Sequence, residues 1–262
     1  MKIFVCIKQV PDSTRVDIDP ETMTLKRGGV DSKINPFDLY AIETAVRLKE
    51  AHDGQICAIS MGPPQSEAAL REAFMLGVDD GVLLSDRNFA GADVLATSYA
   101  LSQGILSLGL PDVIICGRQT TDGDTGQVGP EIAEFLDIPH VAYVRRIVAV
   151  EEQSMILEMD MPETIEVVRV SFPFLMTVEK GIFQPRLPSL RRKMATAERQ
   201  IRRLGLADLP DTDPAHYGLK GSPTQVVRIF PPEHSAGHET WNDTPEALSE
   251  KLYNRLGELK FL

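Results

Sequence analysis

Short apolar runs alternate with amphipathic stretches along the first half of the chain. The apolar runs lie at 2–10, 55–61, 82–84 and 113–116, and Pro, Gly or Asp residues bound them, which is typical of buried strands. The stretches between them repeat apolar residues at helical spacing. Because strands that alternate with helices form a parallel sheet, the pattern predicts a Rossmann-like α/β fold with helices on both faces of that sheet.

The pattern changes after Pro139. Strand-like runs then follow one another without intervening helices, at 141–150, 155–159, 164–170 and 174–178. This order predicts an antiparallel extension of the sheet. Residues 1–184 are therefore expected to form one α/β domain that includes these strands.

Residues 185–262 are predicted to form an extended C-terminal arm that ends in a helix. The arm is rich in proline and arginine, but no aromatic residues alternate with its arginines, so a solvated or partner-facing segment is favoured over a nucleic-acid site. Four leucines share one face of the terminal helix, namely Leu248, Leu252, Leu256 and Leu259. Such a face usually packs on its own domain, and docking on another subunit is the alternative because the arm before it has few core residues.

A glycine-rich loop from Gly117 to Pro130 follows the fourth apolar run and leads into a helix that is expected to begin at Pro130 and Glu131. In open parallel sheets, ligands bind at the carboxyl ends of strands. The loop's four glycines would let successive backbone N–H groups turn toward an anion without a Cβ in the way. A phosphate or pyrophosphate group is the expected ligand of the loop, and the domain is expected to bind a nucleotide.

The loop matches neither the P-loop pattern nor Gly-x-Gly-x-x-Gly. Asp122 and Asp124 would repel a phosphate unless their carboxylates accept hydrogen bonds from the loop's own N–H groups, so turn and capping roles are favoured over direct contact. Thr125 and Gln127 are better placed to donate to phosphate or ribose oxygens. A calcium loop is rejected, because the further ligands and the closing Glu are missing.

Composition narrows the class of protein. The chain has 262 residues and a formal net charge of −11, which argues against nucleic acid as the main partner. No apolar run approaches the ~20 residues of a membrane span, and the N-terminus lacks a signal-peptide pattern, so no membrane insertion and a cytoplasmic location are expected. Cys6, Cys57 and Cys116 lie in apolar runs without metal-binding spacing, and buried reduced thiols are expected.

Two further positions lie near the predicted strand ends. Lys8 could be a solvated strand terminus or a cation that faces a nucleotide, and the sequence leaves both open. Asn35 followed by Pro36 predicts a helix start with Asn35 as the N-cap. A small hairpin is expected at 15–26, between these positions.

Several longer motifs carry a family resemblance. They are VCIKQVPD at 5–12, NPFD at 35–38, MGP at 61–63, GAD at 91–93 with Ala96-Thr97, the 117–130 loop and Pro185-Arg186. Together, in this order and over essentially the whole chain, they resemble the beta subunit of electron transfer flavoproteins, and DGDTGQVGP at 122–130 is the most specific of them. One departure is His234, which stands where many members have an arginine after a Pro-Pro pair.

The resemblance implies a heterodimer in which the arm and terminal helix pack on an alpha subunit that carries a redox FAD. In ordinary members the beta subunit binds structural AMP and docks an acyl-CoA dehydrogenase. In electron-bifurcating members it binds a second FAD, which takes hydride from NADH and splits the electrons between ferredoxin or flavodoxin and, through the alpha-subunit FAD, a dehydrogenase acting on an acyl-CoA or related substrate.

The regions 61–105 and 220–226 are similar to the bifurcating members, so FAD is favoured and AMP remains the alternative. No catalytic residue and no metal are expected, because the cofactor carries the chemistry. The flavin ring is expected to lie by Lys8, Asn35, Met61 and Gly62, with the adenosine end toward the loop and Thr97. The implied cofactor-binding residues are Cys6, Lys8, Asn35, Met61, Gly62, Asp93, Thr97, Gly117, Asp122, Gly123, Asp124, Thr125, Gly126, Gln127 and Val128.

Residues 179–186 are the predicted partner-docking segment. Ile182 and Phe183 follow a glycine just after a strand-like run, and a surface loop does not ordinarily carry two large apolar residues unless it buries them somewhere. They could tuck under their own loop or dock on a partner. The resemblance favours docking, with Ile182 as the anchor in a pocket of the dehydrogenase, Phe183 beside it, and Pro185 and Arg186 at the end of the segment.

Overall fold

The computed structural model describes residues 1–12, 32–227 and 239–262. The hairpin expected at 15–26 and His234 lie outside the described residues. Within the described ranges, no helix combines the length and the apolar character needed to cross a membrane.

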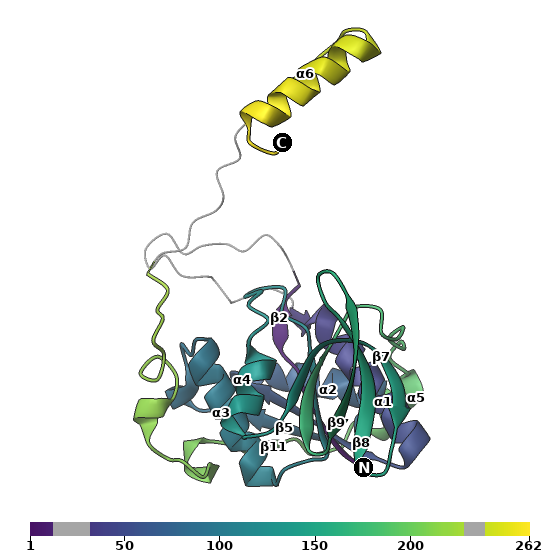
Figure 1. Cartoon of the computed structure of the whole chain (residues 1–262). Coiled ribbons are helices and arrows are strands. Elements are labelled where there is room, and N and C mark those ends of the chain that lie inside the picture. Colours follow the sequence, from purple (N-terminus) through teal and green to yellow (C-terminus); the bar gives the residue numbers. More distant parts are fainter. Residues whose placement is uncertain (13–31, 228–238) are drawn as a thin grey trace. The chain divides into compact units, whose positions relative to one another are not determined.

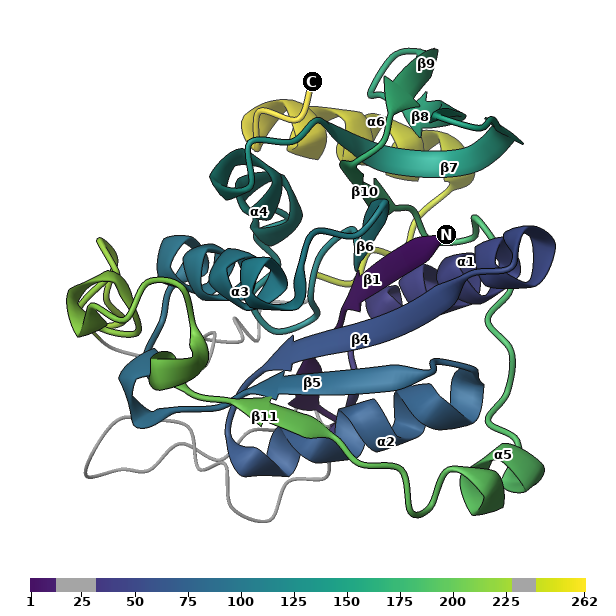
Figure 2. The same cartoon turned by 90° about the horizontal axis from the view of Figure 1, so that it is seen from below.

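Residues 1–227 form one compact unit and residues 228–262 a second one. The first unit is built on a single sheet with the strand order β11-β5-β4-β1-β6-β10-β7-β8-β9 (Figures 1 and 2). The strands are β1 (Lys2–Cys6), β4 (Gln55–Met61), β5 (Asp80–Leu84), β6 (Val113–Gly117), β7 (His140–Val150), β8 (Ser154–Asp160), β9 (Ile165–Ser171), β10 (Phe174–Val178) and β11 (Arg202–Leu204).

Helices cover both faces of this sheet, which confirms the predicted Rossmann-like α/β class. Side chains alternate along β1: Ile3 and Val5 pack with α1 and α2, whereas Phe4 and Cys6 pack on the other face with α3 and α4. The helices and helical turns of the first unit are α1 (Pro36–His52), η1 (Pro64–Ser66), α2 (Glu67–Leu76), η2 (Arg87–Phe89), α3 (Val94–Leu108), α4 (Val128–Phe135), α5 (Leu190–Ala195), η3 (Leu206–Asp208) and η4 (Pro214–His216).

The strand order reverses at β1, and this positions the site. The chain leaves β1 through α1 to β4 and then β5 on one side, and α3 returns it to β6 on the opposite side of β1. The carboxyl ends of β1 and β6 therefore form the topological switch point, where doubly wound sheets bind their ligands.

The C-terminal half of the sheet differs from the expectation in one strand. β7, β8 and β9 pair antiparallel, as predicted, but β10 lies between β6 and β7 and runs parallel to both. All five residues of β10 are buried, as in a central strand covered on both faces. The prediction that the run at 174–178 belongs to the antiparallel extension was therefore wrong.

Two element boundaries also differ. The first strand ends at Cys6, and Gln9–Pro11 instead forms β2, which pairs with β3 (Ser32–Ile34) in a separate antiparallel pair. The helix after the glycine-rich loop begins at Val128 rather than at Pro130. The first turn of this helix packs tightly on β10, since a Cβ at Gly129 would lie 2.7 Å from Thr177 Cγ2.

Part of the arginine-rich arm that was predicted to begin at residue 185 packs against the sheet and helices of the first unit. Arg199 donates to the carbonyl oxygens of Val78 and Asp79 at 2.9 and 2.6 Å, and β11 pairs with β5 at the edge of the sheet. The segment expected to be solvated or partner-facing is therefore partly structural. Sequence reasoning missed β11 because three residues, two of them arginines, carry no strand periodicity.

The second unit contains helix α6 (Pro245–Glu258), which Thr244 caps by accepting a hydrogen bond from the Ala247 N–H. Within its own unit, no residue of α6 is buried, and the side chains of Leu252 and Leu259 are about half exposed.

Candidate nucleotide site

Segments that follow β1 and β6 meet the start of α1 at the switch point. The buried side chain of Asn35 connects them: its Nδ2 donates to the Gln119 carbonyl oxygen at 2.8 Å, and its Oδ1 accepts from the Thr121 N–H at 3.3 Å. Asn35 is the N-cap residue of α1, as predicted, but its side chain makes no capping bond to the helix. It binds the glycine-rich loop instead.

Asp122 and Asp124 have the turn roles that the sequence favoured. Asp122 accepts from the Gly123 N–H at 2.8 Å, and Asp124 adopts a φ of 53° while its carboxylate accepts from Gln119 Nε2. The Lys8 ammonium also lies 2.7 Å from Asp122. Burial alone would raise the pKa of Asp122, but this ammonium holds it below its ordinary value.

The four glycines of the loop serve different purposes. A Cβ at Gly117 would lie 2.5 Å from Asp38 Oδ1, so this glycine permits close packing of β6 on α1. Gly129 permits the close packing of α4 on β10. Among the four, Gly126 alone has a positive φ, of 66°, whereas a side chain at Gly123 would meet only Thr120 Oγ1 at 3.6 Å. The expectation that all four turn N–H groups toward an anion was too broad.

Backbone donors remain available where the loop enters α4. Among the described residues, no acceptor pairs with the N–H groups of Thr125, Gly126 and Gln127, and α4 begins at Val128 without a side-chain cap. Free N–H groups at a helix N-terminus favour an anion, because the helix dipole adds partial positive charge there. This part of the loop is therefore chemically suited to a phosphate.

The other predicted site residues lie around this centre. Lys8 follows β1, Met61 ends the adjacent strand β4 and Gly62 follows it, so the three residues lie at the same edge of the sheet. Thr97 is half-buried on α3, and its neighbour Ser98 lies 3.4 Å from the Val128 carbonyl oxygen. Cys6 is buried against the α3 and α4 face, so it contributes to the core beneath the site.

The carboxylate and the backbone N–H of Asp93 both form hydrogen bonds within the chain. Its carboxylate caps α3 by accepting from the Ala96 N–H at 3.1 Å, and it also accepts from the Thr224 hydroxyl at 2.7 Å. Its own N–H donates to Ser222 Oγ at 2.8 Å. Residues 222–224 thus fasten the end of the first unit to the start of α3, which is a contact that the sequence did not predict.

The predicted docking segment is partly folded into the core. Ile182 is 9% exposed and belongs to the core on the α1 and α2 side, and the Arg47 guanidinium lies over the half-buried Phe183 ring. Arg186 pairs with Glu43 and Glu50 of α1 at 2.8 Å. In this conformation, a partner would reach Phe183 before Ile182.

Sequence reasoning missed Asp38 and Arg118. Asp38 is buried directly behind the loop, and burial raises its pKa to about 7. Its place in the Asn-Pro-Phe-Asp motif was the available signal. Arg118 pairs with Glu179 at 2.8 Å and so joins the glycine-rich loop to the docking segment, and no sequence pattern indicated that pair.

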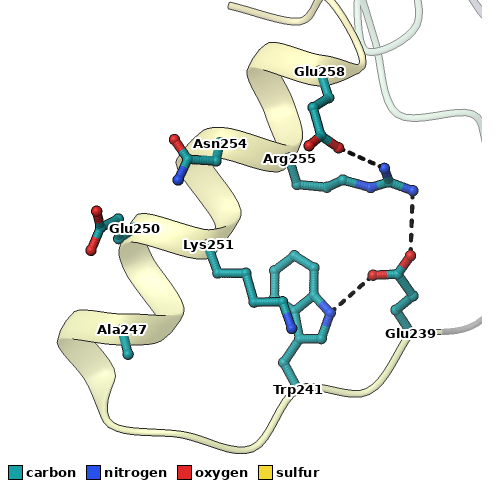
Figure 3. Close-up of a pocket in the computed structure, with 8 residues that line it drawn as sticks. All are labelled: Glu239, Trp241, Ala247, Glu250, Lys251, Asn254, Arg255 and Glu258. Atoms are coloured by element: carbon teal, nitrogen blue, oxygen red, sulfur yellow. Dashed lines mark hydrogen bonds and ion pairs between the residues drawn. The ribbon is translucent and has the colours of Figure 1, made fainter.

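The C-terminal unit has a hollow of its own, of about 380 Å³ (Figure 3). The Lys251 ammonium lies over the Trp241 ring, and Glu239 accepts from both Trp241 and Arg255. None of the predicted nucleotide-binding residues lines it. Across the ranges that the structure describes, no group of three or more His, Cys, Asp or Glu side chains could hold a metal ion.

Fold and site together define a protein of the doubly wound α/β class whose switch point carries a glycine-rich loop with backbone donors suited to an anion. Comparison with known proteins then identifies the family. Residues 22–209 match the model of the electron transfer flavoprotein domain. The chain is 44% identical to the electron transfer flavoprotein subunit beta of Thermoanaerobacterium thermosaccharolyticum, over 98% of each chain, and 42% identical to that of Megasphaera elsdenii, over the full length of both.

A third relative is the caffeyl-CoA reductase-Etf complex subunit CarD of Acetobacterium woodii, which is 41% identical over 96% of this chain and 98% of its own. The chain therefore belongs to the electron transfer flavoprotein family, as a beta subunit.

Proposed function

We propose that this protein is the beta subunit of an electron-bifurcating electron transfer flavoprotein and binds FAD at the switch point. The observation that supports this proposal most strongly concerns the N–H groups of Thr125, Gly126 and Gln127. Among the described residues these groups have no acceptor, and they lie next to the start of α4, which has no side-chain cap. A pyrophosphate fits this donor set. When bound, the flavin would take a hydride from NADH and give up its two electrons separately.

The chain's own residues would position this cofactor. The loop N–H groups would hold the pyrophosphate, with Thr97 toward the adenosine end. Lys8, Met61 and Gly62 would face the ring at the edge of the sheet, where nicotinamide can reach it. The Lys8 side chain is 45% exposed, so its ammonium can approach the ligand if it exchanges its contact with Asp122.

The family resemblance favours FAD over AMP in this proposal, because the 61–105 and 220–226 regions resemble bifurcating members. The two regions are in contact, since Thr224 of the second hydrogen-bonds to Asp93 of the first. The alternative is a non-bifurcating subunit that holds structural AMP. The loop donors support both, because both nucleotides present an adenosine phosphate to them.

The proposed partners are an alpha subunit, ferredoxin or flavodoxin, and a dehydrogenase that acts on an acyl-CoA or related substrate. The name of the Acetobacterium woodii relative, which places it in a complex with a caffeyl-CoA reductase, supports the last of these. The family resemblance supports docking of the arm and α6 on the alpha subunit, and the second unit itself does not bury the leucine face of α6.

The docking segment follows β10, next to the proposed nucleotide loop after β6. Arg118 of that loop donates to Glu179 of the segment, so a partner bound there would lie close to the cofactor.

Phe183→Ala should slow electron transfer to the dehydrogenase and leave flavin content unchanged. Leu110→Ala is the matched control, since Leu110 is also partly exposed but precedes β6 at the opposite edge of the sheet. Equal transfer rates in the two variants would exclude the segment as the docking element.

Gly126→Val tests the loop. The φ of 66° at Gly126 disfavours a β-branched side chain, which would also crowd the phosphate, so nucleotide retention should fall. Gly109→Val carries a similar backbone penalty at φ 77°, but at the opposite edge of the sheet. Nucleotide per folded protein should drop in the first variant alone, and equal retention in both would refute the loop assignment.

A further inference from the structure

A buried carboxylate lies directly behind the glycine-rich loop. Asp38 is 5% exposed, its Oδ2 accepts from the Lys8 N–H at 2.7 Å, and its Oδ1 accepts from Asn35 Nδ2 at 2.9 Å. The Asn35 N–H in turn donates to the Lys8 carbonyl oxygen at 2.8 Å. Asp38 and Asn35 thus clamp the turn after β1 to the first residues of α1.

The same clamp fixes the loop. Both hydrogens of the Asn35 amide are donated, one to Asp38 and one to the Gln119 carbonyl oxygen, while its Oδ1 accepts from the Thr121 N–H. This arrangement requires that the Asp38 oxygen facing the Asn35 NH₂ group accept a hydrogen bond. A donor at that position could not form a hydrogen bond with the NH₂ group. The ionised carboxylate therefore selects the amide orientation that holds the loop.

The contact leaves little room for rearrangement. A Cβ at Gly117 would lie 2.5 Å from Asp38 Oδ1 and 2.9 Å from the Asp38 backbone nitrogen. Asp38 is therefore pressed against the last residue of β6. A change in the hydrogen bonding of Asp38 must therefore move Lys8, Asn35 or the loop itself.

The charges around Asp38 make this arrangement sensitive to pH. Burial raises the pKa of Asp38 to about 7, although the Lys8 N–H, Asn35 and the Lys8 ammonium act in the opposite direction. Asp122 of the loop raises it further, and the buried Cys116 thiol of β6 is the other titratable group nearby. A proton on Asp38 would turn one of its acceptor oxygens into a donor, which would weaken its hold on Lys8 or Asn35.

We propose that Asp38 is a positioning residue that acts through Asn35 to hold the glycine-rich loop in its phosphate-binding conformation, so that nucleotide affinity falls when Asp38 gains a proton. This inference rests on the proposed nucleotide function of the loop. Asp38 itself is buried against Asn35 and Gly117 of β6. The step is a change in protonation and hydrogen bonding, and no covalent bond is made or broken.

The test measures the dissociation constant of ADP for the full chain stripped of bound nucleotide, across neutral pH. In the unaltered protein, the constant should rise as pH falls through about 7. Asp38→Asn presents one acceptor where two are needed, so it should bind ADP about tenfold more weakly above neutrality, with a flat pH profile. Asp112→Asn is the matched control, because Asp112 accepts from the Lys2 N–H at 2.7 Å at the opposite end of β1 and should leave ADP binding unchanged.

The outcomes separate the two proposals. An Asp38→Asn protein that keeps the affinity and pH profile of the unaltered chain would overturn the inference and leave the nucleotide site standing. If this variant does not fold, Asn35→Ala provides the test: weakened ADP binding by a folded protein supports the inference, and unchanged binding overturns it. Failure of the unaltered chain to bind ADP at any pH would overturn the proposed function itself.

Discussion

Gly117→Ala is the substitution that most sharply tests how β6, α1 and the loop are packed. A Cβ at this position would lie 2.5 Å from Asp38 Oδ1, 2.7 Å from the Phe37 carbonyl carbon and 2.9 Å from the Asp38 nitrogen. Two of these three neighbours are backbone atoms of the first turn of α1. A side-chain rotation therefore cannot relieve the contact, and the start of α1 has to move.

The cost follows from this geometry. Inserting one methyl group into a tightly packed contact typically costs about 1–3 kcal/mol, and the backbone neighbours favour the upper half of that range here. For a unit of this size, each kcal/mol corresponds to roughly 2–4 °C in Tm. Movement of Asp38 should also disturb Asn35 and lower nucleotide retention.

Gly123→Ala in the same loop is the control. Its Cβ would meet only Thr120 Oγ1 at 3.6 Å, and its φ is not positive, so the unfolding free energy should change by less than about 1 kcal/mol. Urea unfolding of both variants, followed by far-UV circular dichroism, gives the two values. Equal unfolding free energies would refute the close packing of Gly117 on α1.

Two other changes have definite expected results. Ile182→Ala removes a core side chain that is 9% exposed, so the unfolding free energy should fall by about 2–4 kcal/mol in urea titrations, and a neutral effect would mean that Ile182 is exposed in solution. Asp211 raises the pKa of His216, so this pair stabilises the fold fully below the ordinary His pKa of 6.5 and the contribution is lost as pH rises through the raised folded-state value. The difference in Tm between the native protein and His216→Asn should therefore shrink from acidic to alkaline pH, and a difference that grows instead would contradict the pairing.

Much of the fold could be predicted because the chain's periodicity is local. The run at 55–61 became β4 with the predicted bounds, and Asp93 caps α3 where Gly91-Ala92-Asp93 indicated a helix start. The direction of β10 could not be predicted, because a five-residue apolar run fits a central parallel strand and an antiparallel one equally well.

The place of the glycine-rich loop in the fold was predictable, but the contacts that support the loop were not. The loop was predicted from its place after the apolar run at 113–116, and Lys8 from its place near the end of the run at 2–10. The clamp formed by Asp38 and Asn35 depends on contacts between residues more than 80 positions apart in sequence, as between Asn35 and Gln119, and no single-sequence pattern contains them. The burial of Ile182 likewise depends on how the segment after β10 folds back on α1.

The most direct test of the central claim is the nucleotide content of the purified heterodimer with its alpha subunit. Acid release followed by chromatography counts FAD and AMP per heterodimer, and anaerobic addition of NADH shows whether flavin is reduced. The proposed function predicts two FAD, no AMP and rapid flavin reduction by NADH. One FAD with one AMP, and no reduction by NADH, would contradict it and establish the non-bifurcating alternative.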